Sequence, residues 1–312
     1  MISYKVKVKK SVSAVGSSLY YDKEEEDLYF SIMLEPNTIR LCRYNVINEN
    51  ATLISGLKGV LLSAIQNESR LYLLHSYGLA IFNKTTNKME ANIKKKIGKN
   101  NYMLQRITDN YLGITSIFSQ SIKLFNIVSK EIDRSIYFPR VDLCKKMDTR
   151  YRFYSFWSGN VGLYDSSLKK IESDELPTAK DPFVKDSIIY VLLGRRSNDN
   201  SSTPSQCYRI KSLHILCALD SYTLKIVQQK EIPFLERLID IDKLRNQIIG
   251  VTHKGIAYID LETFDVIQEV PLDYIDYELD SMAYMGQGKV AILPFNMSFE
   301  DTAIEFHVIS DV

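Results

Sequence analysis

Histidine is the residue type best suited to acid–base or metal chemistry, and the chain has only four. His75 and His253 occupy similar positions, each near the end of an alternating apolar run and shortly before Gly78 or Gly255. One interpretation is a shared metal site or general base. The other, which we favour because no third ligand accompanies the pair, is two polar residues at strand ends.

Established catalytic motifs are missing from the rest of the sequence. There is no glycine-rich loop that follows a strand and opens a helix, no HExxH and no GxSxG. The expected inner strands carry acidic residues at Glu236, Asp240 and Asp280, too few to define a site. We therefore expect no catalytic residues, no metal and no cofactor. The alternative is an enzyme or small-ligand binder that uses a central channel.

Aromatic residues at expected turns offer binding chemistry instead. The only tryptophan, Trp157, precedes Ser158 and Gly159, where the chain turns. It is either an exposed anchor for a partner or a packing plug between repeats. Tyr77 and Phe118 occupy similar turns.

A long insertion runs from Gly194 to Lys211, with serine and asparagine at its centre and arginine, tyrosine and lysine at its flanks. Long loops in compact domains are often functional, although a loop also absorbs extra length at small entropic cost. We predict that it binds a partner, with a tolerated insertion as the alternative. With the turn residues, the candidate binding residues are Tyr77, Phe118, Trp157, Arg195, Arg196, Tyr208, Arg209, Lys211 and Lys254.

The elements that must position these residues follow from a short sequence pattern that recurs along the whole chain. Each copy is an alternating apolar run that ends in Asn, Asp or Ser and is followed by a polar turn and another alternating run. Its end positions lie 38 to 55 residues apart, at Asn45, Asn83, Asn126, Asp165, Asp220, Asp260 and Ser310. This spacing is close to the roughly 40 to 50 residues of a propeller blade.

The repeat around Asp260 resolves into four short strands, at 235–240, 247–252, 255–260 and 264–270. The second is almost wholly apolar, which indicates burial on both faces, and the fourth alternates, which indicates one face in water. Between the last two, the Asp260 carboxylate can accept hydrogen bonds from the following backbone amides. The sequence thus predicts an all-β fold: a seven-bladed β-propeller with four-stranded antiparallel blades.

The two ends of the chain complete this prediction. The seventh repeat has no outer strand of its own, and a spare alternating segment at 3–9 precedes the first repeat. Pairing the two would complete the last blade and remove exposed sheet edges. The pattern resembles WD40-like seven-bladed propellers over essentially the whole chain, although blades end in Phe-Asn, Tyr-Asp or Ile-Asp in place of Trp-Asp. The resemblance implies a ring closed by the N-terminal strand, and we expect residues 1–312 to form a single β-propeller domain.

Composition narrows the class of protein. With 45% hydrophobic and 25% charged residues, the chain is typical of a globular protein. The first ten residues alternate lysine with apolar residues and lack the apolar stretch of a secretory signal, and no run approaches the roughly 18 apolar residues of a membrane span. The four cysteines show no CxxC spacing, which favours reduced thiols. We expect a cytoplasmic protein without a transmembrane segment.

The formal net charge of +1 conceals an expected asymmetry between two faces. In known propellers, loops from second to third strands and from blade to blade share one face, the top, and the remaining loops share the bottom. Sorted this way, the top loops are rich in lysine and arginine, whereas the bottom loops are rich in carboxylates, as at Glu24 to Glu26. The alternative is that these are merely solvated charges.

These observations favour a non-catalytic protein-interaction module, a scaffold or adaptor. We predict that its basic top face binds a protein or peptide partner that is acidic or phosphorylated. An anionic lipid surface is an alternative ligand. Nucleic acid is not favoured, because no stacked aromatics in a basic groove are encoded.

Overall fold

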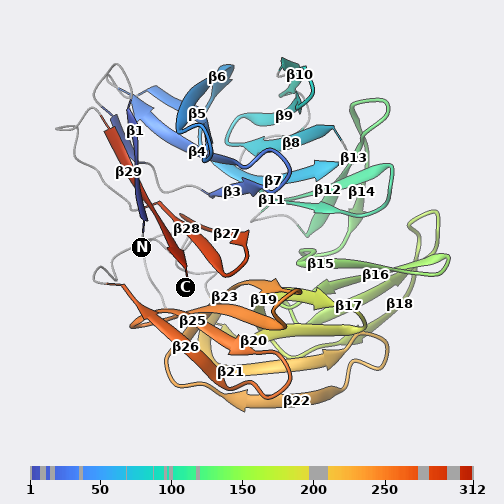
Figure 1. The fold of residues 1–312 in the computed structure, drawn as a ribbon. Coiled ribbons are helices and arrows are strands. Elements are labelled where there is room, and N and C mark those ends of the chain that lie inside the picture. The colour runs from blue at the N-terminus through green and yellow to red at the C-terminus, as the bar shows by residue number, and fades with distance from the viewer. Residues whose placement is uncertain are drawn as a thin grey trace.

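The part of the chain that the structure describes forms seven antiparallel sheets, which are arranged in a ring (Figure 1). The computed structural model describes residues 2–7, 12–14, 18–34, 38–67, 69–86, 88–94, 97, 101–116, 120–196, 210–272, 281–293 and 303–310. The predicted all-β, seven-bladed propeller is confirmed. In these ranges, no helix has the length and apolar character needed to cross a membrane.

Blade 1 has a divided inner strand. The short strands β2 (Val12–Ala14) and β3 (Tyr20–Asp22) both pair with β4 (Asp27–Leu34), at opposite ends of it. Outward from β4 follow β5 (Thr38–Asn45) and β6 (Asn50–Lys58). This division gives the sheet a fifth strand, one more than predicted.

Blades 2 to 6 each consist of four consecutive strands, with the innermost first. Blades 2 and 3 are formed by β7 (Leu61–Asn67), β8 (Arg70–His75), β9 (Gly78–Asn83), β10 (Lys88–Ile93), β11 (Asn101–Arg106), β12 (Tyr111–Ser116), β13 (Ser121–Asn126) and β14 (Glu131–Tyr137). Blades 4 and 5 are formed by β15 (Leu143–Met147), β16 (Arg150–Ser155), β17 (Asn160–Tyr164), β18 (Lys170–Glu175), β19 (Ala179–Lys185), β20 (Ile188–Arg196), β21 (Ile210–Asp220) and β22 (Ile226–Glu231). Blade 6 is formed by β23 (Leu235–Asp242), β24 (Gln247–Thr252), β25 (Gly255–Asp260) and β26 (Val266–Pro271).

Blade 7 combines strands from both ends of the chain. Its order from the centre outward is β27 (Met282–Gly286), β28 (Lys289–Ile292), β29 (Ala303–Ser310) and β1 (Ile2–Lys7). Strand β1 runs antiparallel to β29, and both termini are drawn beside this blade in Figure 1. The N-terminal strand is therefore the outer strand of the sheet that contains the last strands of the chain.

The recurring Asn or Asp of the sequence stands at or just after the end of the third strand in blades 1 to 6. Asp260 ends β25, and its Oδ1 accepts hydrogen bonds from the backbone N–H groups of Glu262 at 2.9 Å and Thr263 at 2.8 Å. The same acceptor role is played by Asn45, Asn83, Asn126, Asp165 and Asp220. The predicted turn chemistry is confirmed, because these side chains satisfy amides that the sheet leaves unpaired.

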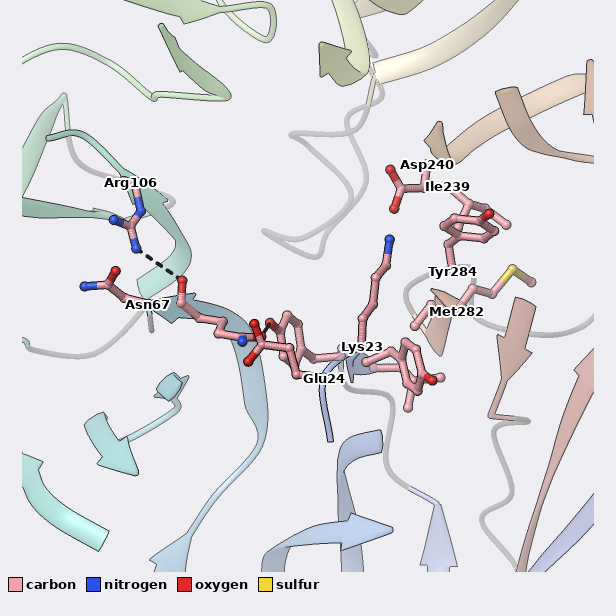
Figure 2. A pocket seen from close by; sticks show the side chains of 13 residues that line it. Lys23, Glu24, Asn67, Arg106, Ile239, Asp240, Met282 and Tyr284 are labelled. Atoms are coloured by element: carbon pink, nitrogen blue, oxygen red, sulfur yellow. Dashed lines mark hydrogen bonds between the residues drawn. The ribbon is translucent and has the colours of Figure 1, made fainter. Parts of the chain in front are cut away.

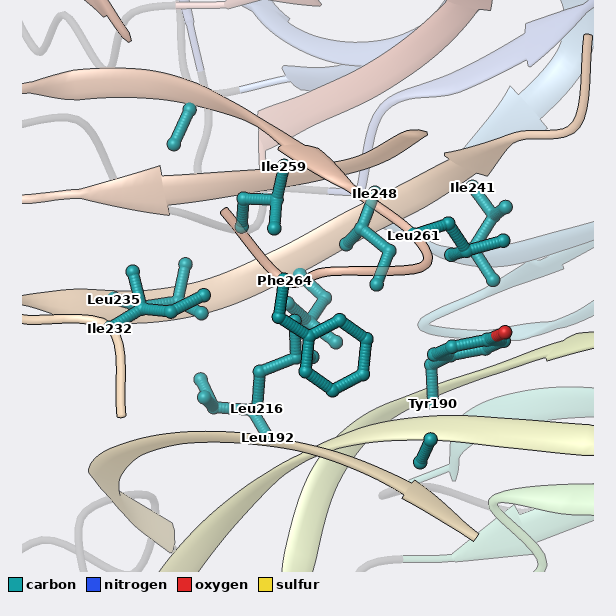
Figure 3. Packing of buried hydrophobic residues seen from close by; sticks show 13 residues of the cluster. Tyr190, Leu192, Leu216, Ile232, Leu235, Ile241, Ile248, Ile259, Leu261 and Phe264 are labelled. Atoms are coloured by element: carbon teal, nitrogen blue, oxygen red, sulfur yellow. The ribbon is translucent and has the colours of Figure 1, made fainter. Parts of the chain in front are cut away.

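Apolar clusters fill the space between neighbouring blades all the way around the ring. Between blades 5 and 6, Leu192 and Leu216 face Ile248 and Ile259, with Phe264 at the centre (Figure 3). In blade 6, β24 is covered on both faces and is almost wholly apolar, as the sequence predicted.

Polar contacts at the bottom of the ring also join neighbouring blades. In blade 4, Arg152 Nη1 and the Tyr154 hydroxyl both donate to the carbonyl of Ser221 in blade 5, at 2.8 and 2.9 Å. The buried Lys84 ammonium of blade 2 lies 2.8 Å from the buried Asp22 carboxylate of blade 1. Such contacts make the ring a rigid support for the turns at its two faces.

Candidate functional site

An exposed phenylalanine stands on the top face where blade 5 connects to blade 6. The connection Ile232-Pro233-Phe234-Leu235 is a turn, closed by a 3.1 Å hydrogen bond from the Leu235 N–H to the Ile232 carbonyl. Phe234 has a φ of 65°, the left-handed conformation that glycine normally supplies at the third position of such a turn. Its side chain nevertheless faces solvent, with Phe234 54% exposed. A bulky residue held this way is a genuine conformational outlier.

A bulge in blade 5 holds this turn in place. Between the pairs Leu192–Leu216 and Gly194–Ser212, β20 contributes only Leu193, whereas β21 contributes three residues including His214. His214 also has a left-handed φ, of 60°. Its carbonyl accepts the Ile232 N–H at 2.7 Å, and its Nδ1 lies 2.9 Å from the Leu235 carbonyl. The two strained residues therefore support one another across the blade boundary.

Side chains from both blades gather around the phenylalanine ring. The His253 ring lies 4.1 Å from that of Phe234, centroid to centroid, and the His214 ring lies 6.3 Å from it. Lys254 follows His253 in the same turn, and Lys211 precedes Ser212, whose hydroxyl donates to the Leu235 carbonyl. Both lysines are exposed. We call the set His214, Phe234, His253, Lys254 and Lys211 the Phe234 rim.

The hydrogen bond to Leu235 fixes the chemistry of His214. A carbonyl can only accept, so Nδ1 carries the proton and Nε2 of the neutral ring is left as an acceptor. Glu236 Oε1 lies 3.8 Å from Nδ1 and places a carboxylate on that side of the ring. Nearer the channel, burial lowers the pKa of Lys180, while the carboxylates of Asp181 and Glu236 oppose that shift. The rim thus combines an aromatic surface with cationic and titratable groups.

Among the predicted binding residues, Lys211 and Lys254 belong to this rim. Arg195 is exposed and lies opposite Lys211 in the β20–β21 ladder, next to Arg196. The expected loop from Gly194 to Lys211 is therefore wrong at both ends, because β20 continues to Arg196 and β21 begins at Ile210. The bulge explains the difference, since it lets the ladder resume beyond the register shift.

The remaining predicted binding residues lie elsewhere. Tyr77, 57% exposed, sits in the β8–β9 turn of blade 2, where its ring lies against Gly59. Trp157 is half-buried in the β16–β17 turn of blade 4, and its backbone N–H donates to Asp142 Oδ2 at 3.1 Å. Phe118, Tyr208 and Arg209 lie outside the described residues.

The predicted equivalence of His75 and His253 is wrong by one residue. His75 is the last residue of β8 and pairs with Gly78. In blade 6, β24 already ends at Thr252, so His253 lies within the turn that leads to Gly255. His75 is buried, its Nε2 lies 3.2 Å from Asn92 Oδ1, and burial lowers its pKa. The two histidines therefore have different environments. In the described part of the chain, no three His, Cys, Asp or Glu side chains are grouped closely enough to hold a metal ion.

The contrast between a basic top and an acidic bottom needs correction on both faces. On the top, Arg140 is ion-paired with the buried Asp142 and is not an available cation. The bottom turns that carry Glu24 to Glu26 and similar carboxylates also hold basic residues, namely Lys23, Lys84, Lys130, Lys169, Lys225, Lys243 and Arg245. The bottom is therefore mixed in charge, and the exposed cations nearest Phe234 come from blades 5 and 6.

The bottom mouth of the central channel contains a cavity of about 760 Å³. It lies between inner-strand residues of blades 1, 2, 3, 6 and 7, and Figure 2 shows Lys23 extending toward Asp240, with Arg106 at another wall. Burial raises the pKa of Asp240, and the nearby Lys23 opposes this. Of the predicted channel carboxylates, Asp240 lines this cavity, Glu236 lies by His214, and Asp280 is outside the described residues.

Comparison with known proteins identifies the fold. No family model matches the sequence, and no curated protein matches it. Among solved structures, the WD40 domain of Neurospora crassa Pan2 is similar, with a TM-score of 0.64, 10% identity and coverage of 95% of this chain and 88% of that one. The β-propeller domain of Myceliophteria thermophila Cps50 (Swd1) has a TM-score of 0.62, 8% identity and coverage of 99% and 100%. The Doa1 WD40 propeller has a TM-score of 0.60, 12% identity and coverage of 97% of each chain. The chain therefore has the architecture of WD40 β-propeller domains.

Proposed function

We propose that this protein is an interaction module whose Phe234 rim binds an acidic segment of a partner protein. The observation that carries the proposal is Phe234 itself, an exposed aromatic residue in a left-handed backbone conformation. A residue in that conformation costs about 1 to 2 kcal/mol unless its surroundings compensate. Solvent exposure offers little compensation here, and uncompensated strain of this kind is concentrated at functional positions.

The chemistry around Phe234 indicates what the partner segment should look like. An aromatic side chain in the middle of a surface is the usual anchor of a protein interface. Lys211 and Lys254 are exposed beside it, and Arg195 lies opposite Lys211 in the same hairpin. Carboxylates or phosphates placed around an apolar anchor residue would complement these cations and steer association.

The two histidines of the rim add a further polar element. With Nδ1 donating to the Leu235 carbonyl, the neutral His214 ring offers Nε2 as an acceptor for a donor group of the partner. The seven-bladed ring supports the site, because it holds turns of neighbouring blades at fixed positions.

A separation-of-function variant tests the proposal. Phe234→Gly removes the aromatic anchor and places in the turn the residue that its backbone conformation favours. Leu244→Ala is the matched control, because Leu244 is an apolar residue, 91% exposed, in a bottom turn of the same blade. Proteins captured by the wild-type chain should be lost with Phe234→Gly and retained with Leu244→Ala, as measured by quantitative mass spectrometry.

Charge reversal at the rim tests the nature of the partner. Lys254→Glu should reduce recovery of the same proteins by about tenfold, an amount that corresponds to roughly 1.4 kcal/mol of binding free energy. Phosphatase treatment of the captured proteins separates a phosphorylated segment from one rich in aspartate and glutamate. Equal recovery by the wild type and by Phe234→Gly would remove the basis for placing the interface here, and binding to anionic vesicles alone would replace the protein partner with a lipid surface.

A further inference from the structure

The cavity at the bottom mouth of the channel contains charged groups with unused bonding capacity. The Lys23 ammonium lies 5.0 Å from the centre of the Tyr284 ring, and among the described residues it makes no ion pair. Asp240 Oδ1 accepts the Ile241 N–H at 2.8 Å, while no described donor reaches its other carboxylate oxygen. Arg106 donates from Nη2 to the Gln66 carbonyl at 3.2 Å, which leaves other guanidinium donors available.

The remaining carboxylate of the cavity is already engaged. Glu24 Oε2 lies 2.8 Å from Lys84 Nζ, and this hydrogen bond lowers the pKa of Glu24. The cavity therefore presents two available cations, from blades 1 and 3, and one available carboxylate from blade 6. Figure 2 shows the Lys23 side chain pointing toward Asp240 from the opposite wall.

We propose that this cavity binds a small zwitterion, an amino acid or a short peptide. Its carboxylate groups would face Lys23 and Arg106, and its protonated amine would face Asp240. An anion without an amine would place added negative charge next to the Asp240 carboxylate. A cation without a carboxylate would place added positive charge next to the Lys23 ammonium. Only a ligand that carries both charges complements the whole set.

The size and walls of the cavity agree with such a ligand. Pockets for small molecules typically measure about 300 to 1,000 Å³, and this cavity of about 760 Å³ falls in that range. Tyr20, Tyr284 and Met282 supply aromatic and thioether surface for an apolar part of the ligand. A guanidinium such as that of Arg106 matches the geometry of a carboxylate. The site is built from the bottom ends of the inner strands and does not depend on the interaction proposed for the Phe234 rim.

Isothermal titration calorimetry on the full chain tests this site with defined probes. Glycyl-L-glutamate supplies two carboxylates and a protonated amine, and its N-acetyl derivative has the same carboxylates without the amine. Inorganic phosphate is the probe for simple anion binding. We expect glycyl-L-glutamate to bind at millimolar or lower concentration and to bind at least about tenfold more tightly than either control probe.

Matched variants connect the binding to the named residues. Asp240→Asn removes the charge but keeps the shape, and Lys23→Ala changes an exposed side chain, so neither should prevent folding. Each should weaken glycyl-L-glutamate binding by about tenfold or more. Lys225→Ala, an exposed lysine in a bottom turn of blade 5 that does not line the cavity, should leave it unchanged.

Three results would overturn the inference. They are no heat of binding with glycyl-L-glutamate at millimolar concentration, equal affinity for the N-acetyl peptide or phosphate, or unchanged affinity in both cavity variants. Thermal unfolding of each variant by circular dichroism shows whether the propeller is intact, so that a loss of binding reports on the cavity. A failure of this test leaves the proposal for the Phe234 rim unaffected, because the cavity variants and the rim variants lie on opposite faces of the ring.

Discussion

Two phenylalanines in the same pair of blades occupy turns with the same unusual backbone conformation and have opposite environments. Phe264, in the bottom turn between β25 and β26, has a φ of 59° and is completely buried in the cluster between blades 5 and 6. Phe234, in the top turn between blades 5 and 6, has a φ of 65° and is 54% exposed. The backbone cost is therefore similar at both positions, but what each side chain gains in return differs.

Burial explains the bottom turn completely. Burying a phenylalanine side chain contributes about 1.5 to 3 kcal/mol, which exceeds the cost of about 1 to 2 kcal/mol for the left-handed conformation. The Phe264 ring also meets that of Tyr190 edge-on, with the centroids 6.2 Å apart. Among the described residues, the top turn has no comparable gain. The comparison teaches that packing of the side chain offsets the strain of an aromatic residue in such a turn. At Phe234 this packing is partial, because its ring contacts His253 but remains 54% exposed.

The largest effect expected from this comparison is on the buried member of the pair. Phe264→Ala should lower the free energy of unfolding by about 3 to 5 kcal/mol, because it removes a fully buried ring and leaves a cavity between two blades. Urea denaturation followed by circular dichroism measures the loss. A decrease below about 1 kcal/mol would mean that the blade interface collapses around the missing ring, and the argument from burial would fail.

The corresponding bottom turn of blade 4 tests the same balance with a smaller side chain. Leu168 has a φ of 60° and is buried in the cluster between blades 3 and 4. Leu168→Gly relieves the backbone conformation but loses the buried leucine, so the net loss of unfolding free energy should be about 2 kcal/mol. Leu168→Ala, which keeps the strain, should lose more. If the alanine variant is the more stable of the two, backbone strain does not enter the balance.

Most of the fold could be predicted from the sequence, because the recurring Asn or Asp is set by local chemistry. Asn83, Asp220 and Asp260 each end a third strand and accept hydrogen bonds from the amides that follow. A turn that depends on one side chain and its neighbours leaves a signal in a single stretch of sequence. The bulge in β21 could not be predicted this way, because it depends on contacts between His214 and the next blade.

The candidate site was largely missed for a related reason. The run Ile232-Pro233-Phe234-Leu235 contains three apolar residues and resembles the start of a buried strand. Pro233 was the available signal, since proline favours the second position of a turn and would place Phe234 at the third. Lys211 and Lys254 could be predicted because lysines at expected turns and loop flanks are usually exposed. The one-residue difference at His253 lies in its spacing from glycine. Across turns of equal length, His75 stands three residues before Gly78, whereas His253 stands two residues before Gly255.

The top of blade 2 offers a second contrast with the Phe234 rim, because its strand-end histidine is buried. Burial lowers the pKa of His75 below its unfolded value of about 6.5. The unfolded chain then binds more protons than the folded one as the pH falls, so stability is lost from about pH 7 downward through the folded pKa. His75→Gln should make the free energy of unfolding less dependent on pH between about 7 and 5, by up to about 1.4 kcal/mol per unit. Parallel curves for the two proteins would show that His75 does not titrate differently in the folded state.

The smallest effect on stability is expected where the proposed function is placed. Phe234→Gly relieves the left-handed backbone but loses the contact with His253 and increases the entropy of the unfolded chain, so these terms nearly cancel. We expect the free energy of unfolding to change by less than about 1 kcal/mol in either direction. Urea denaturation of Phe234→Gly beside Phe264→Ala measures both turns on one scale. A loss at Phe234 as large as that at Phe264 would mean that the exposed ring serves stability, and its conformation would then need no partner to explain it.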